Sequence, residues 1–116
     1  MSISFEGIGQ WCATFACENV REGMVVKMKG NGKVGKSGEG DLFFGVVTAV
    51  AHDGKACSVQ LGGFVTLPYT GEDDPALGVS NLIADGNGGV MHGYGTGQDF
   101  IAVFIDKVAK TITIKL

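Results

Sequence analysis

Short segments that alternate between apolar and polar residues recur along the chain. Residues 111–116, TITIKL, place Ile112, Ile114 and Leu116 on one face, and residues 56–61, ACSVQL, alternate in the same way. A period of two residues is typical of a β-strand with one face buried. The pattern therefore predicts a strand in each of these segments, with the alternate apolar residues facing a core.

Other segments are apolar runs rich in aromatic and β-branched residues, which favour strands. We expect these further strands at 2–5, 10–17, 24–28, 42–51, 64–67 and 100–105. Residues 76–84, ALGVSNLIA, fit either a single helical turn or another short strand. No window favours an amphipathic helix of three turns, and we identify neither an internal repeat nor a linker.

Glycine and Asx turns separate the segments, and the chain has twenty glycines against two prolines. We expect turns at 30–32, 53–54, 62–63, 85–89 and 106–110, and we expect Pro68 to end the strand before it. Turn signals about every 8–12 residues are typical of a sandwich or barrel. We therefore predict an all-β fold: a small antiparallel β-barrel or sandwich of about eight short strands, with little or no helix.

A length of 116 residues indicates one domain, so residues 1–116 are interpreted as a single β domain. Hydrophobic residues make up 45% of the chain and charged residues 18%, which is a composition typical of a folded protein. Residues 1–9, MSISFEGIG, form either a terminal strand of this domain, which we favour, or an N-terminal arm or edge strand that pairs with a neighbour.

The charge of the chain argues against nucleic acid as a partner. The formal net charge is −3 and the isoelectric point is near 5.2, whereas nucleic-acid binders present a basic face. Basic residues do gather between Lys27 and Lys36, where we expect a solvated turn. The sequence shows neither a signal peptide nor a transmembrane run, so we expect no membrane partner.

The three cysteines are Cys12, Cys17 and Cys57. Their odd number and their spacing, which matches no zinc site, indicate reduced thiols in a protein made in a cytoplasm. We expect them to be buried as small hydrophobic side chains.

Residues 30–37, GNGKVGKS, match the phosphate-loop pattern G-x-x-x-x-G-K-[ST], and residues 100–106, FIAVFID, look like the strand that carries its partner aspartate. A phosphate loop needs a helix directly after the lysine, because the helix N-terminus holds the phosphate. Here GEGD follows Ser37, and each glycine in a first helical turn costs about 1 kcal/mol relative to alanine. We therefore predict an exposed hairpin or loop over residues 30–40, within an antiparallel sheet.

Other candidate sites have plainer interpretations. His52 could meet Cys57 across a hairpin, but a solvated turn histidine is the better reading, and His92 has no partner in the sequence around it. The acidic run 72–74, EDD, lacks the spacing of an EF-hand calcium loop, and we expect an exposed loop there. The turn 85–89, DGNGG, resembles the turns of calcium-binding repeats but occurs once, whereas such sites need stacked copies. We predict no catalytic residue, no cofactor-binding residue, no metal ligand and no cofactor.

Four segments follow one another in an order that a known family shares. They are 20–26, VREGMVV; 43–71, in which GFVTLP at 63–68 fits G-x-[FV]-x-L-P; 78–90, which ends in L-x-A-D-x-x-G-x-V; and the final hairpin, 100–116. Together they resemble the capsid cement, or decoration, proteins of tailed phages and prophages.

The resemblance implies a non-enzymatic virion structural protein that binds the outer surface of a capsid through edge strands and loops, often as an oligomer. Its partners would be the major capsid protein or another virion protein, together with further copies of itself. It would be made in the bacterial cytoplasm and assembled into the virion. The alternative is a small ligand-binding β module with a carbohydrate as ligand, which requires exposed aromatic side chains grouped on one face.

Overall fold

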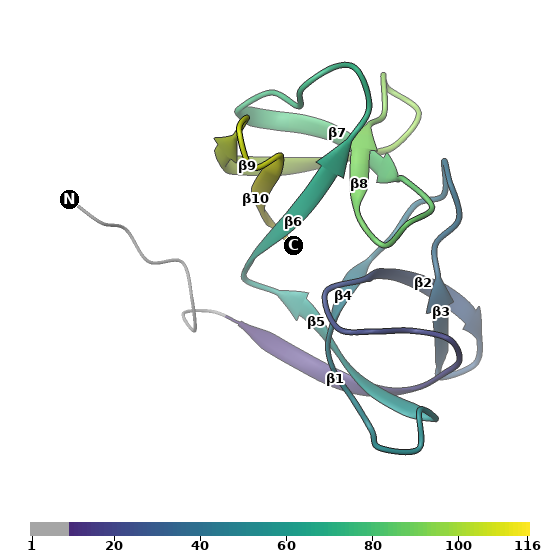
Figure 1. Cartoon of the computed structure of the whole chain (residues 1–116). Coiled ribbons are helices and arrows are strands. Elements are labelled where there is room, and N and C mark those ends of the chain that lie inside the picture. Colours follow the sequence, from purple (N-terminus) through teal and green to yellow (C-terminus); the bar gives the residue numbers. More distant parts are fainter. Residues whose placement is uncertain (1–9) are drawn as a thin grey trace.

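The computed structural model describes residues 10–116. The predicted strand at 2–5 and the predicted terminal strand or arm at 1–9 lie outside the described residues. The described part contains ten strands and no helix, which confirms the all-β prediction. The strands close into two five-stranded barrels, one below the other in Figure 1. In the segment 76–84, for which the sequence fits either a helical turn or a strand, residues 78–84 form a strand.

The first barrel occupies the N-terminal half of the described chain. Its strands are β1 (Trp11–Cys17), β2 (Val25–Gly30), β3 (Lys33–Lys36), β4 (Gly45–Val50) and β5 (Ala56–Gly62). Their order around the barrel is β1-β3-β2-β4-β5. The pair β1–β3 is parallel and the other four pairs are antiparallel.

The second barrel follows after one residue, Gly63. Its strands are β6 (Phe64–Thr70), β7 (Gly78–Ala84), β8 (Val90–His92), β9 (Gln98–Asp106) and β10 (Thr111–Lys115). Their order is β10-β6-β8-β7-β9, with β6–β8 parallel and the other pairs antiparallel. Gly63 has φ of 86°, a conformation that glycine adopts without strain, and the expected bend at 62–63 is therefore where the barrels join.

The two barrels have the same topology. β6 to β10 pair with one another as β1 to β5 do, including the parallel pair between the first and third strands. The ladders also agree in register, since Thr14 pairs with Ser58 as Thr66 pairs with Thr113. The chain therefore contains an internal repeat, and the prediction that it has none is wrong.

Small details support the repeat. Each fourth strand has an irregularity at the same position of its ladder, where Thr48 in β4 and Val103 in β9 are left out of the pairing. The turn between the second and third strands reads Gly-Asn-Gly-x-Val in both barrels, at 30–34 and at 86–90. Its second glycine, Gly32 or Gly88, has positive φ in both. The strands themselves differ in sequence, and this difference hides the repeat.

Two apolar cores fill the barrels. The core of the first barrel consists of Cys17, Met24, Val26, Val34, Val47, Cys57 and Val59. The core of the second barrel contains Leu67, Tyr69, Leu82, Ile112 and Ile114 among others, and it also takes in Val25, Phe43 and Val46 from the first barrel. The barrels therefore share a continuous apolar interface.

Some predicted boundaries and burials are wrong. β6 runs through Pro68 to Thr70. Pro68 pairs with Thr111 of β10 and has no partner in β8, and the adjacent Tyr69 donates its N–H to Lys110 O at 2.9 Å, so the missing N–H of Pro68 costs no strand pairing. β4 begins only at Gly45, although an apolar run begins at residue 42. Cys12 is exposed, whereas Cys17 and Cys57 are buried as expected.

Candidate functional site

The phosphate-loop-like segment is a hairpin. Residues 31–32 turn between β2 and β3, β3 ends at Lys36, and no helix follows, as predicted from the glycines after Ser37. The segment is not wholly exposed, because Val34 and Ser37 are fully buried. β3 pairs with β2 in the antiparallel orientation and with β1 in the parallel orientation. Without a helix N-terminus, the segment lacks the dipole that holds a nucleotide phosphate.

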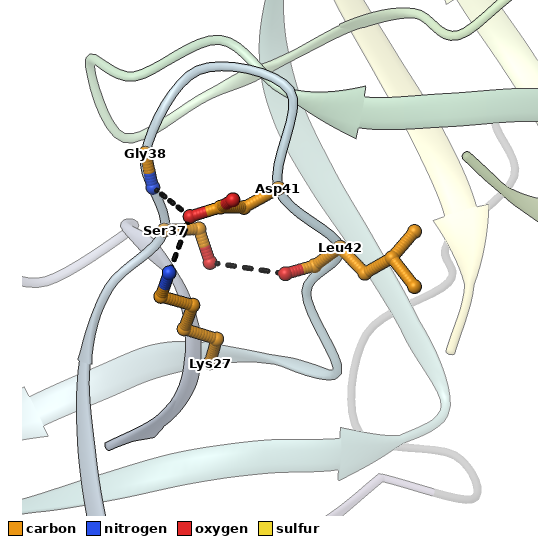
Figure 2. A network of polar contacts seen from close by, with 5 residues as sticks. All are labelled: Lys27, Ser37, Gly38, Asp41 and Leu42. Carbon is orange, nitrogen blue, oxygen red and sulfur yellow. Dashed lines mark hydrogen bonds and ion pairs between the residues drawn. The ribbon is translucent and has the colours of Figure 1, made fainter. Parts of the chain in front are cut away.

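Residues 37–44, here called the interbarrel loop, follow the hairpin. Figure 2 shows how its first turn is held: Asp41 Oδ2 accepts hydrogen bonds from Gly38 N at 2.9 Å and from Lys27 Nζ at 2.5 Å. The hydroxyl of Ser37 donates to Leu42 O at 3.4 Å. The bond from Lys27, followed by the bond from Gly38, lowers the pKa of Asp41 below its usual value.

The interbarrel loop ties the barrels together through the backbone. Gly40 N donates to Ala84 O at 3.0 Å, and Ala84 N donates to Asp41 O at 2.9 Å. The buried ring of Phe43 then enters the core of the second barrel. The residues after the motif therefore have a structural role in joining the two repeats.

A surface groove of about 390 Å³ lies beside the same hairpin and is lined by Glu18, Asn19, Lys29, Val34 and the neighbouring β3 residues. Lys33 forms an ion pair with Glu18, which lowers the pKa of that carboxyl. Lys29 lies across Gly35, where an added Cβ would come within 2.7 Å of Lys29 Cγ. The hairpin end is therefore basic, and part of its charge is balanced within the chain.

The structure does not bring the other candidate catalytic residues together. His52 is exposed in the β4–β5 turn. Cys57 is buried, and its free thiol forms a hydrogen bond with the thiol of Cys17. Burial, followed by the hydrogen bond with Cys17, raises the pKa of Cys57 to about 11, which suppresses the nucleophilic thiolate. His92 stacks against Tyr94, with ring centroids 4.2 Å apart.

The acidic candidates have structural partners. Asp85 Oδ1 accepts from Asn87 N at 2.7 Å and from Gly89 N at 3.1 Å, so it shapes the β7–β8 turn. The run 72–74 is exposed, and Asp74 accepts a hydrogen bond from the Tyr69 hydroxyl. Within residues 10–116, no three metal-ligating side chains come together.

A row of four side chains crosses the outside of each barrel, here called the outer row. In the first barrel the row is Cys12, Gln60, Val46 and Val25, and in the second it is Phe64, Lys115, Ile101 and Val79. Val25 and Val46 are 0% and 2% exposed, whereas Val79 and Ile101 are 68% and 51% exposed. The same outer surface is thus covered in one repeat and open in the other, a difference that the sequence did not reveal.

The β9–β10 hairpin carries two further exposed apolar side chains. Phe104, near the end of β9, is 56% exposed, and Val108, in the turn, is 97% exposed. The Asp106 carboxylate accepts hydrogen bonds from Val108 N and Ala109 N, both at 3.0 Å, which fixes the turn. An ordered turn thus presents Val108 to solvent.

The aromatic residues divide between core and surface. Phe43, Tyr69 and Phe100 are buried, whereas Trp11 and Tyr94 are exposed. Trp11 begins β1 of the first barrel and lies over Gly62, while Tyr94 lies in the β8–β9 loop of the second barrel. These two rings therefore belong to different barrels.

Comparisons with known proteins add no family. No protein-family model matches the chain, and neither the curated proteins nor the solved structures contain a match. In the described part of the chain, no helix has the length and apolar character needed to cross a membrane.

Proposed function

We propose that the protein is a non-enzymatic virion structural protein, a decoration protein that binds the surface of a phage or prophage capsid. The proposal rests on the order of segments that resembles this family and on a surface suited to protein contact. The observation that carries it is the β9–β10 hairpin, which exposes Phe104 in β9 and Val108 in a turn ordered by Asp106. Large apolar side chains exposed on one hairpin favour contact with another protein.

The closed barrels change where we place that contact. Each described strand has a partner on both sides in its barrel, so free edges are confined to the unpaired parts of strands. β1 meets β3 only at Ala16 and Cys17, and β6 meets β8 only at Tyr69 and Thr70. Loops, outer faces and these short edges are therefore the surfaces proposed to meet the capsid.

Co-sedimentation with purified capsids of the cognate phage tests the proposal. We expect the wild-type chain to sediment with the shell and to raise the temperature at which the shell melts. Val108→Asp should weaken binding about tenfold or more, because it places a charge in an apolar contact. The matched control is His52→Asp, which adds the same charge to the corresponding hairpin of the first barrel and should leave binding unchanged. Lack of binding by the wild type, or equal binding by Val108→Asp, would contradict the proposal.

The alternative is a carbohydrate-binding module, which the exposed rings of Trp11 and Tyr94 keep open. A sugar platform needs stacked aromatic faces close together. Glycan-array binding that is lost in Trp11→Ala or Tyr94→Ala, with no binding to capsids, would favour this alternative.

A further inference from the structure

The interface between the two barrels shows how one repeat covers another. The β7–β8 turn of the second barrel, residues 85–89, lies against the start of β2 in the first barrel: Val25 N donates to Gly88 O at 3.0 Å, and Arg21 Nη2 donates to Asn87 O at 3.0 Å. Gly88 has φ of 93°, and a Cβ added there would lie 3.1 Å from Arg21 Nη2, so the glycine suits this turn. The Gly-Asn-Gly turn thus meets the first barrel beside Val25, at the end of the outer row. The side chains of Val25 and Val46 are themselves covered by apolar side chains of the second barrel.

The corresponding surface of the second barrel has no such cover. Val79 takes the place of Val25 in the outer row, and it is 68% exposed. Ile101 takes the place of Val46 and is 51% exposed, and the neighbouring Leu77 is 66% exposed. Here Leu77, Val79 and Ile101 are called the open face. Three large apolar side chains together in water indicate a surface that is covered in an assembly.

The corresponding turn of the first barrel is also unused. Residues 30–32 are exposed, and a Cβ added at Gly30 or Gly32 would meet no heavy atom within 4 Å. Each chain therefore carries one Gly-Asn-Gly turn that is docked and one that is free. It likewise carries one outer row that is covered and one that is open.

Charge favours joining the free turn to the open face. Lys29, Lys33 and Lys36 flank the free turn, and the ion pairs in the described chain use only Lys33 of these three. The exposed acidic run 72–74 precedes Leu77, and Asp99 accepts a hydrogen bond from Asn81, two residues after Val79. The cations beside them are Lys115, which pairs with Ile101, and Lys110, which forms an ion pair with Asp74. The carboxylates outnumber these two lysines, so the surroundings of the open face are acidic and complement a basic turn.

We propose that a second copy of this chain docks head to tail, with its basic turn at 30–32 placed on the open face of the first copy. Within one molecule a Gly-Asn-Gly turn already meets the end of an outer row at Val25, and the proposed contact places the second such turn at the open row of another molecule. Because the two surfaces differ, the interface is heterologous and generates a ring if the rotation closes or a filament if it does not. The inference does not depend on capsid binding.

Sedimentation velocity over a range of protein concentration and salt tests the proposal. We expect the wild type to grow beyond its 12.0 kDa chain mass as concentration rises, and added salt to weaken the association. The face variant, Val79→Lys, and the turn variant, Lys29→Glu with Lys36→Glu, should each stay monomeric. His52→Lys, an equally charged change at an exposed site outside the open face, should associate as the wild type does.

Mixing the two variants gives the decisive result. The face variant keeps an intact turn and the turn variant keeps an intact face, so their mixture should form a one-to-one dimer. A symmetric interface would give no such rescue, and a monomeric mixture beside an associating wild type would overturn the proposal. A wild type that stays monomeric, or single variants that associate normally, would overturn it as well.

Two further measurements keep the test independent of folding and of capsid binding. Near-ultraviolet circular dichroism should show native packing in each variant, and Ile101→Lys provides a second face variant if Val79→Lys fails to fold. Val79→Lys should still reach capsids through the β9–β10 hairpin. Loss of self-association with capsid binding retained separates this interface from the proposed capsid contact.

Discussion

Phe43 and Phe100 stack with their ring centroids 5.0 Å apart and their planes inclined by only 9°. One ring comes from the interbarrel loop of the first barrel and the other from β9 of the second. Both are buried, at 3% and 6% exposure. The stacked rings therefore pack one barrel against the other, while the chain connects β5 to β6 through the single residue Gly63.

Phe43→Ala should destabilise the fold by about 3–5 kcal/mol, because it removes a buried ring and leaves a cavity between the barrels. Urea unfolding measures the change. Phe43→Ala, Phe100→Ala and the double variant form a double-mutant cycle. Its coupling energy should be about 0.5–1.5 kcal/mol for an aromatic pair. Strictly additive losses would show that the rings do not interact as the structure describes.

Gly97→Ala should cost about 1–3 kcal/mol, as overpacked sites commonly do. An added Cβ would lie 2.2 Å from Leu82 O, a backbone atom that cannot turn away. Gly30→Ala is the matched control, because its added Cβ meets nothing within 4 Å. Urea midpoints at low protein concentration compare the two variants. Equal midpoints would mean that β7 and the start of β9 are farther apart than described.

Asp41→Asn should lower stability at neutral pH, and the difference from the wild type should fade in acid. The pKa of Asp41 is lowered in the folded chain, so its contribution is present above the unfolded value of about 3.9 and disappears as pH falls through the folded value. Urea midpoints across this range test the effect. Glu39→Gln removes a charge from the same loop outside the network of Figure 2 and should show a smaller effect at neutral pH. A constant gap between wild type and Asp41→Asn at all pH values would contradict the role of this carboxylate.

One thiol per chain should react with a soluble thiol reagent at mildly alkaline pH, and three should react after denaturation. Cys12 is exposed, whereas Cys17 and Cys57 are buried and the pKa of Cys57 is about 11. Slow labelling of the buried pair follows from both effects. Mass spectrometry identifies the modified residue, with Cys12→Ser as the control that should react only when unfolded. Rapid native labelling of Cys57 would show that the first barrel opens readily.

Much of the fold could be predicted from the sequence. Alternation in 111–116 and the Asp53-Gly54 turn are local signals, and the structure confirms both as β10 and as the β4–β5 connection. The absence of a helix after Ser37 was likewise predictable, because glycine acts locally. The parallel pairs β1–β3 and β6–β8 could not be predicted, because the alternation of apolar and polar residues within a strand does not reveal which other strand it pairs with.

The candidate surfaces were harder to predict. Alternation places both Val46 and Ile101 on the outer face of a strand. Only the packing of the two barrels against each other shows that Val46 is covered and Ile101 is exposed. The two copies of Gly-Asn-Gly-x-Val were the available sign of the repeat. A five-residue match with one variable position is too short to stand out in a chain with twenty glycines.

The single residue between the barrels also has a consequence for synthesis. The first barrel can close once Gly62 has left the ribosome, but Phe100, which packs on Phe43, is made later. At about 5–20 residues per second this interval lasts roughly 2–8 seconds. During this interval the nascent chain exposes Val25 and Val46 to solvent, and we expect chaperone binding or aggregation to concentrate at this stage.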